Sequence, residues 1–186
     1  YSRLVIDCNR RLDDPSSIAQ ESDRIPVPGN RGLSAGERKA RAETIFRPYH
    51  DAIDAIVARK RDAGPLPAMV SLHSFPPRMN GFARPWHVGV LWNRDARLPV
   101  PIMKRLLKEP GTVVGDNEPY SGRDEHGYSM PYHAEAPGLP HALFEVRQDL
   151  IGHEAGVVEW ADRLVRVLRD VLADDRVYQP QGGPLG

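Results

Sequence analysis

The sequence predicts an α/β fold built around one layered sheet, and three observations support this. Short apolar runs alternate along the chain with longer segments of helical periodicity, which is typical of layered α/β proteins. The chain has 186 residues, a length that suits one domain with a substantial core. Its residues are 40% hydrophobic and 27% charged, as in globular proteins. We therefore expect a single domain over residues 1–178 and a flexible Gly/Pro-rich tail over residues 179–186.

Charge and cysteine content narrow the class of protein. Lys plus Arg and Asp plus Glu number 25 each, which argues against a nucleic-acid partner or an anionic membrane surface. The single cysteine, Cys8, excludes an intrachain disulfide and a cysteine-based zinc cage, and it favours a cytoplasmic location. No apolar run approaches the roughly 20 residues that span a bilayer. The chain enters an apolar run directly at Tyr1, which is typical of a fragment.

The first part of the chain is expected to hold one strand and one long helix. Residues 4–6 form a short apolar run that predicts a buried strand ending in a polar cluster at residues 7–10. Residues 13–32 are polar and rich in Pro and Gly, which predicts a long loop. Ser34 and Glu37 form a capping-box pattern, so a helix should follow.

Apolar residues at helical spacing predict which face of that helix meets the core. Pro48 lies within the pattern and predicts a kink or a break. The residues expected to face the core are Ile45, Tyr49, Ile53, Ile56 and Val57.

The remaining chain is expected to alternate strands and helices. A long loop, which carries several Tyr and His residues, is predicted at residues 116–137. Strands are predicted at residues 68–72, 86–92, 112–114 and 142–146. Helices are predicted at residues 102–108 and 157–171.

Polar residues that end these strands predict a site. His73 follows one predicted strand, Glu145 lies within another, and Arg10 and Arg147 lie close to strand ends. If the strands are parallel, these residues meet at one edge of the sheet. A neutral imidazole is a good zinc ligand, and a carboxylate can take a proton from a metal-bound water. Because a guanidinium binds a carboxylate with two hydrogen bonds, this set fits hydrolysis of an amide next to a free acid.

Each of these residues has a structural alternative. A histidine after a strand is more often a hydrogen-bonding group than a metal ligand. Glu145 could simply be the ion-pair partner of Arg147 or Arg10, and Arg10 could be a surface charge. The sequence lacks the Gly-x-Ser-x-Gly elbow of serine hydrolases, phosphate-binding and dinucleotide-binding Gly-rich loops, and a His-Glu-x-x-His pair. Any metal site must therefore be assembled from separated segments.

Several motifs of the sequence resemble those of the N-formylglutamate amidohydrolase family, which is distantly similar to zinc carboxypeptidases and aspartoacylases. The resemblance extends from about Arg3 to Leu172. The long motifs are VIDCNR (5–10), SLHSF (71–75), RPWHVGVLW (84–92), GDNEPYSG (115–122) and FEVRQDL (144–150), with PGN (28–30) and RPYH (47–50) as shorter ones.

The resemblance implies a fold and roles for individual residues. It implies a three-layer αβα domain with a mixed, mostly parallel sheet, like that of zinc exopeptidases. It further implies that His73 is a zinc ligand and that Glu145 is the general base. The residues implied to bind substrate are Asn9, Arg10, Arg84, Tyr120, His133 and Arg147.

The activity implied is the zinc-dependent hydrolysis of N-formyl-L-glutamate to formate and L-glutamate by a bacterial enzyme of histidine degradation. Family members usually carry an upstream segment that resembles the source of the other metal ligands, and this sequence starts downstream of it. Two alternatives remain open. One is hydrolysis of another N-acyl amino acid, and the other is a metal-free module that binds a small molecule.

Overall fold

The computed structural model describes residues 1–124 and 127–179, and these residues divide into two compact units. Unit 1 consists of Tyr1–Pro65 with the described part of Glu125–His133. Unit 2 consists of Leu66–Asp124 with the described part of Ala134–Gly186. The predicted single domain over residues 1–178 stays a prediction. His126 and residues 180–186 of the predicted tail lie outside the described residues.

Unit 1 is formed by short segments and one long helix. Its small core consists of Ile6, Ile18, Ala42 and Phe46. The elements are the 3-10 helices η1 (Pro15–Ile18) and η2 (Pro28–Asn30), the two-stranded β1 (Glu21–Ser22) and β2 (Ile25–Pro26), the helices α1 (Ala35–Arg41) and α2 (Arg47–Asp62), and the π-helical turn η3 (Ala42–Phe46) between them.

The strand predicted at residues 4–6 is absent, and that prediction is wrong. Side chains bind the carbonyl groups that a strand would offer to its neighbour. Asn30 Nδ2 donates to Leu4 O at 2.8 Å, and Arg41 Nη1 donates to Val5 O at 2.7 Å. Because each carbonyl already has a partner, the segment is stable without a β-ladder.

The predicted helix forms, and the capping box is confirmed. Ser34 Oγ accepts from Glu37 N at 3.2 Å, and Glu37 Oε2 accepts from Ser34 N at 2.8 Å. The α-helical geometry is interrupted near Pro48, as predicted: a π-helical turn follows α1, and α2 then begins with Pro48 in its first turn. Tyr49 and Ile56 are about half exposed, so the prediction that they face the core is wrong.

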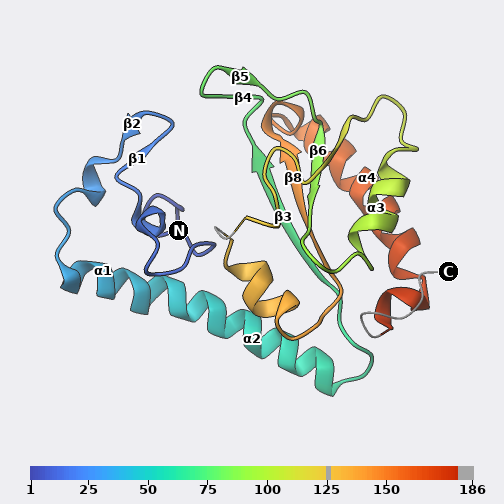
Figure 1. Ribbon diagram of the computed structural model, residues 1–186, viewed down its shortest axis with the longest axis horizontal. Helices are drawn as coiled ribbons and strands as arrows, with labels where there is room; N and C mark the ends of the chain where they lie inside the picture. Colours follow the sequence, from blue (N-terminus) through green and yellow to red (C-terminus); the bar gives the residue numbers. More distant parts are fainter. Residues whose placement is uncertain (125–126, 180–186) are drawn as a thin grey trace. The chain divides into compact units, whose positions relative to one another are not determined.

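A four-stranded sheet in the order β3-β8-β6-β7 organises unit 2 (Figure 1). The pairs β3–β8 and β6–β7 are parallel, and β6–β8 is antiparallel. The predicted α/β class with a mixed, mostly parallel sheet is thereby confirmed. The strands of the sheet are β3 (Met69–Phe75), β6 (Val88–Leu91), β7 (Val114–Asp116) and β8 (His141–Arg147), and a separate hairpin consists of β4 (Arg78–Met79) and β5 (Phe82–Ala83).

Two helices cover one face of this sheet, α3 (Pro99–Leu106) and α4 (Glu154–Leu172) (Figure 1). The core of unit 2 lies between them and the sheet and includes Phe144, Ile102 and Trp160. The 3-10 turns η5 (Gln148–Leu150) and η6 (Asp175–Tyr178) flank α4 in sequence, and the π-helical turn η4 (Pro131–Glu135) spans the boundary between the units in sequence.

The predicted elements of unit 2 are present, with shifted ends. Helix α3 begins three residues early because Pro99 and Pro101 occupy its first turn, where no backbone N–H is needed. Strand β7 begins at Val114, where the predicted strand ended, and reaches into the predicted loop. Across residues 1–124 and 127–179, no helix has both the length and the apolar character required to cross a membrane.

Candidate functional site

His73 and Glu145 lie side by side on neighbouring parallel strands of unit 2. The β3–β8 register pairs the two residues directly, and His73 Nδ1 lies 3.8 Å from Glu145 Oε1. The Glu145 side chain is 7% exposed and that of His73 is 21% exposed. The sequence therefore predicted correctly that these two residues come together, whereas their chemical roles stay predictions.

The strand alternation places this pair on the face of the sheet opposite α3 and α4. Phe144 and Val146 point into the core beneath the helices, so Glu145 between them points the other way. His73 occupies the paired position of β3 and shares that face.

A backbone segment approaches the same face of the sheet beside Glu145. Gly89 of β6 is paired with Glu145, and a Cβ atom at Gly89 would lie only 1.9 Å from Glu118 O. Only glycine permits this contact, so Gly89 allows the Glu118 segment to border the pair. The sequence alone predicts no role for Gly89 or Glu118, although a glycine within a predicted strand indicates a close backbone approach.

Arg84 and Tyr120 contact each other in unit 2. Arg84 Nη1 donates to the Tyr120 hydroxyl at 3.0 Å, and the guanidinium carbon lies 4.8 Å from the centre of the Tyr120 ring. The Phe75 ring at the end of β3 lies 5.8 Å from the same guanidinium carbon. Two residues predicted to bind substrate are thus brought together at the end of the strand that carries His73.

Arg147 is already engaged by protein groups. Its Nε donates to Asp149 Oδ1 at 2.7 Å, and its Nη1 donates to Pro85 O at 3.2 Å. The hydrogen bonds from Arg147 hold the Asp149 pKa below its usual value. This arrangement favours a role for Arg147 in fixing the backbone next to Arg84 rather than in binding substrate directly.

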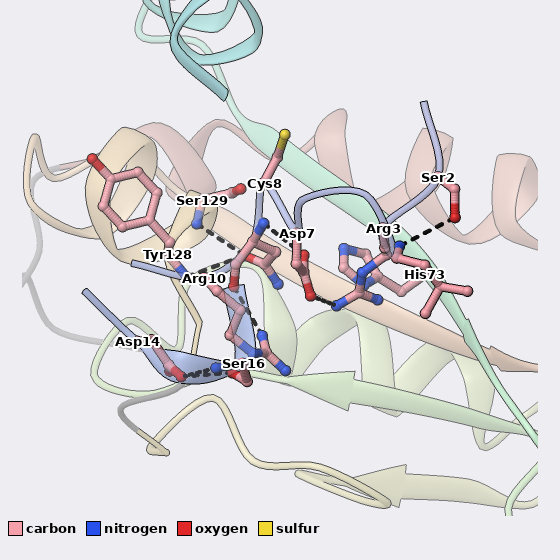
Figure 2. A network of polar contacts seen from close by, with 12 residues as sticks. Ser2, Arg3, Asp7, Cys8, Arg10, Asp14, Ser16, His73, Tyr128 and Ser129 are labelled. Atoms are coloured by element: carbon pink, nitrogen blue, oxygen red, sulfur yellow. Dashed lines mark hydrogen bonds and ion pairs between the residues drawn. The ribbon is translucent and has the colours of Figure 1, made fainter. Parts of the chain in front are cut away.

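Asn9 and Arg10 belong to a tight turn in unit 1, and Figure 2 shows Asp7, Cys8 and Arg10 of this turn. Asp7 Oδ1 accepts from Asn9 N at 2.9 Å, and Asp7 O accepts from Arg10 N at 3.1 Å. Asn9 Oδ1 accepts from the backbone N–H groups of Tyr128 and Ser129 at 3.1 and 2.9 Å. An Asn amide bound through its oxygen can still donate from its nitrogen, as a carboxylate ligand requires.

His133 also belongs to unit 1, and its side chain is fully buried. Both ring nitrogens have protein partners: Asp54 Oδ1 lies 2.7 Å from Nδ1, and His50 Nδ1 lies 2.7 Å from Nε2. This geometry leaves no ring nitrogen for a substrate, so it favours an indirect role over the predicted direct contact.

The described residues fit a zinc site only in part. The half-buried imidazole of His73 beside a carboxylate has the chemistry of a metal ligand beside a base. However, residues 1–124 and 127–179 contain no group of three His, Cys, Asp or Glu residues that could hold a metal ion. A catalytic zinc site needs about three protein ligands, so the described part of the chain does not complete one.

A mixed sheet that carries a histidine and a carboxylate on neighbouring strands suits a hydrolytic enzyme. Comparison with known families identifies the class as amidohydrolases. The chain belongs to the N-formylglutamate amidohydrolase family, whose model matches residues 1–152.

Two solved structures are similar to this one. The gene product Atu2144 from Agrobacterium tumefaciens is 32% identical with a TM-score of 0.88, and the match covers 93% of this chain and 68% of that one. The N-formylglutamate amidohydrolase from Ralstonia eutropha JMP134 is 21% identical with a TM-score of 0.66, and the match covers 94% of this chain and 75% of that one. This second likeness shows the fold alone. No curated protein matches the chain.

Proposed function

We propose that this protein hydrolyses the amide bond of N-formyl-L-glutamate to formate and L-glutamate. The observation that carries the proposal is the pair of His73 and Glu145 on adjacent strands of a chain that belongs to this family. A buried carboxylate next to an imidazole, on the face of the sheet opposite α3 and α4, suits proton transfer during hydrolysis.

Glu145 is the proposed general base. It takes a proton from water as the water oxygen bonds to the formyl carbon, and it returns that proton to the nitrogen as the C–N bond breaks. A divalent metal such as zinc, when bound, polarises a carbonyl group. His73 would be one of its ligands, and the others would come from outside the described residues.

Separate cationic groups are proposed to bind the carboxylates of the substrate. Arg10, with the amide nitrogen of Asn9, is proposed to bind one of them by charge-assisted hydrogen bonds. Arg84 is proposed for the second, because its contact with Tyr120 holds the guanidinium in place whereas Arg147 is bound to Asp149. Tyr120 would act by orienting Arg84.

Two alternatives lead to different experimental results. Another N-acyl amino acid could be the substrate, because the described motifs do not define an acyl pocket. A metal-free binding module is the second alternative, and the incomplete ligand set of the described residues is the observation in its favour.

Metal content and formate release should be measured together on the full-length protein with N-formyl-L-glutamate. The proposal expects bound zinc and formate release, both lost in His73→Ala. Bound metal without formate release would point to another N-acyl substrate, which a substrate panel would identify. Absence of both metal and activity would overturn the proposal in favour of the binding module.

A further inference from the structure

A continuous chain of hydrogen-bonded side chains lies inside unit 1. Asp54 Oδ1 lies 2.7 Å from His133 Nδ1, and His133 Nε2 lies 2.7 Å from His50 Nδ1. His50 Nε2 lies 2.9 Å from the carbonyl oxygen of Cys8. The chain therefore ends on the peptide group that joins Cys8 to Asn9, and we refer to Asp54, His133 and His50 as the histidine relay.

The helix spacing in α2 makes this arrangement possible. His50 and Asp54 are four residues apart and face the same side of the helix, so one imidazole can bridge them. That imidazole comes from His133 in the π-helical turn η4. The sequence Pro-Tyr-His occurs at residues 48–50 and again at residues 131–133, and the structure joins the two histidines.

The polar atoms at the two ends fix the number of protons in the relay. The Cys8 carbonyl can only accept, so His50 Nε2 must donate to it. Three hydrogen bonds then require three protons, whereas two neutral histidines and one ionised aspartate carry only two. The relay therefore binds one additional proton, and the three side chains together carry no net charge.

The additional proton lies between Asp54 and His133, whose atoms Oδ1 and Nδ1 are 2.7 Å apart. Burial is the main cause that lowers the pKa of His50, so a positive charge is disfavoured there. His133 Nε2 then donates to His50 Nδ1, and His50 Nε2 donates to the Cys8 carbonyl.

Aromatic rings enclose the two histidines. Measured between ring centroids, Phe46 lies 4.3 Å and Tyr128 lies 4.8 Å from His50. The Tyr132 ring lies 4.8 Å from the His133 ring. The two imidazoles themselves stack at 5.0 Å. Because these rings exclude water, the hydrogen bond between the two histidines is strengthened.

We propose that the histidine relay is a positioning device that fixes the Cys8–Asn9 peptide and thereby orients Asn9 and Arg10 to bind a substrate carboxylate. This inference rests on the proposed function for its substrate, but its geometry stands on unit 1 alone. The relay residues touch no substrate and act through the peptide that they hold.

A simple packing role for the two histidines leads to a different expectation. Asp54→Ala changes little of the packing, because the side chain that it removes is half exposed. It does remove the group that shares the additional proton with His133, whereas an asparagine could still donate to His133 Nδ1. A packing role would therefore leave substrate binding unchanged in Asp54→Ala, whereas a positioning role would weaken it.

The test compares Asp54→Ala with Asp62→Ala, which truncates an exposed aspartate on the same helix. In the full-length protein, we expect Asp54→Ala to raise the KM and the Kd for N-formyl-L-glutamate about tenfold, as loss of one hydrogen bond to a charged group would. The kcat should stay within about twofold, since the base of unit 2 is unchanged. Asp62→Ala should leave all three constants unchanged.

Two further variants separate the hydrogen bond to Cys8 from the bulk of the His50 ring. His50→Gln can still donate to the Cys8 carbonyl, so it should retain more affinity than His50→Leu. Equal loss of affinity in both variants would indicate packing and would overturn the proposal. Thermal unfolding of each variant checks that the chain is folded.

A spectroscopic readout is independent of catalysis. In ¹H–¹⁵N spectra of the imidazole groups, we expect Nε2 of His133 and Nε2 of His50 to carry protons and Nδ1 of His50 to carry none. Asp54→Ala should change the ¹⁵N resonances of the His133 ring and shift the backbone amide resonance of Asn9. A spectrum without these features would overturn the relay even if the protein is active.

The outcomes also distinguish a failed relay from a failed function. If Arg10→Met weakens binding of N-formyl-L-glutamate but Asp54→Ala does not, the relay proposal is wrong and the proposed function stands. If the protein neither binds nor hydrolyses N-formyl-L-glutamate, the proposed function is wrong, and the Asn9 amide shift alone then decides whether the relay fixes this peptide.

Discussion

The two units hold their candidate residues by different physical means. In unit 2, His73 and Glu145 occupy paired positions of two strands, so the backbone ladder sets their separation. In unit 1, Asn9 and Arg10 belong to no strand, and side chains such as Asp7 and His50 hold their backbone. The unit 2 pair should therefore tolerate changes in neighbouring side chains, whereas the unit 1 turn should depend on individual hydrogen bonds.

The largest expected effect is the loss of turnover in Glu145→Gln. Glutamine keeps the shape of the side chain, and the β3–β8 ladder keeps its position, but the amide cannot accept a proton from water. We expect kcat for formate release to fall by about 10²–10⁴-fold while the Kd for N-formyl-L-glutamate changes little. Glu21→Gln, an exposed glutamate of β1, is the matched control. Full activity in Glu145→Gln would contradict the assignment of the base.

The next largest effect is expected in the stability of the protein. Two Asp–Arg ion pairs of unit 2, each with the Arg two residues after the Asp, allow the comparison. Asp95 and Arg97 are almost fully buried, whereas Asp174 and Arg176 are exposed and share the same pattern of hydrogen bonds. Arg97 also donates to Gly138 O and Gln179 O, and these bonds tie separate segments together. Asp95→Ala leaves a buried guanidinium without its carboxylate, and we expect a loss of about 3–5 kcal/mol in the free energy of unfolding.

Asp174→Ala is the control for burial, and urea unfolding is the measurement. Hydrogen bonds from Arg176 lower the pKa of Asp174 to about 2, but water screens this exposed pair. We therefore expect a much smaller loss in Asp174→Ala. Equal losses in the two variants would show that burial is not what makes the Asp95 pair strong.

The same contrast between the units explains what the sequence could predict. Strand periodicity identified β3, β6 and β8, and parallel pairing then brings His73 beside Glu145. The segment at residues 4–10 escaped this reasoning because the groups that bind its carbonyls are the side chains of Asn30, Arg41 and His50, which lie far along the sequence. Periodicity reports the burial of apolar residues and carries no information about such hydrogen bonds.

The histidines of unit 1 show the same limit. The family resemblance implies a substrate-binding role for His133 and none for His50, because a single sequence does not reveal which buried groups bind each other. The repeated Pro-Tyr-His triplet was the one visible signal. Gly89 gave a comparable signal in unit 2, where its close approach to Glu118 became clear only with the backbone in place.

A third prediction tests whether the unit 1 turn binds a carboxylate. Arg10→Met keeps much of the length of the side chain but removes its charge and its donors. We expect KM and Kd for N-formyl-L-glutamate to rise roughly 10- to 100-fold, as for loss of a charge-assisted hydrogen bond. Because Glu145 is untouched, kcat should fall far less than in Glu145→Gln. Arg11→Met is the control, since Arg11 is exposed and pairs only locally with Asp13. An unchanged KM in Arg10→Met would remove Arg10 from the proposed site.

The smallest effect is expected at the capping box of α1, where one local hydrogen-bond pair starts the helix that leads to His50. Ser34→Ala removes the side-chain acceptor of Glu37 N, and we expect a loss of about 1 kcal/mol in the free energy of unfolding.

Backbone and hydroxyl hydrogen bonds from Ser34 lower the pKa of Glu37 below its usual value of 4.5. This contribution is therefore fully present above pH 4.5 and is lost as the pH falls through the folded-state pKa, because protonated Glu37 accepts these bonds poorly. When urea unfolding is measured between about pH 6 and pH 3, the free energy of unfolding should accordingly decrease less in Glu37→Gln than in the natural sequence. Parallel curves for the two proteins would show that the charge of Glu37 does not contribute to the capping box. The contribution of the box to α1 would then come from Ser34 alone.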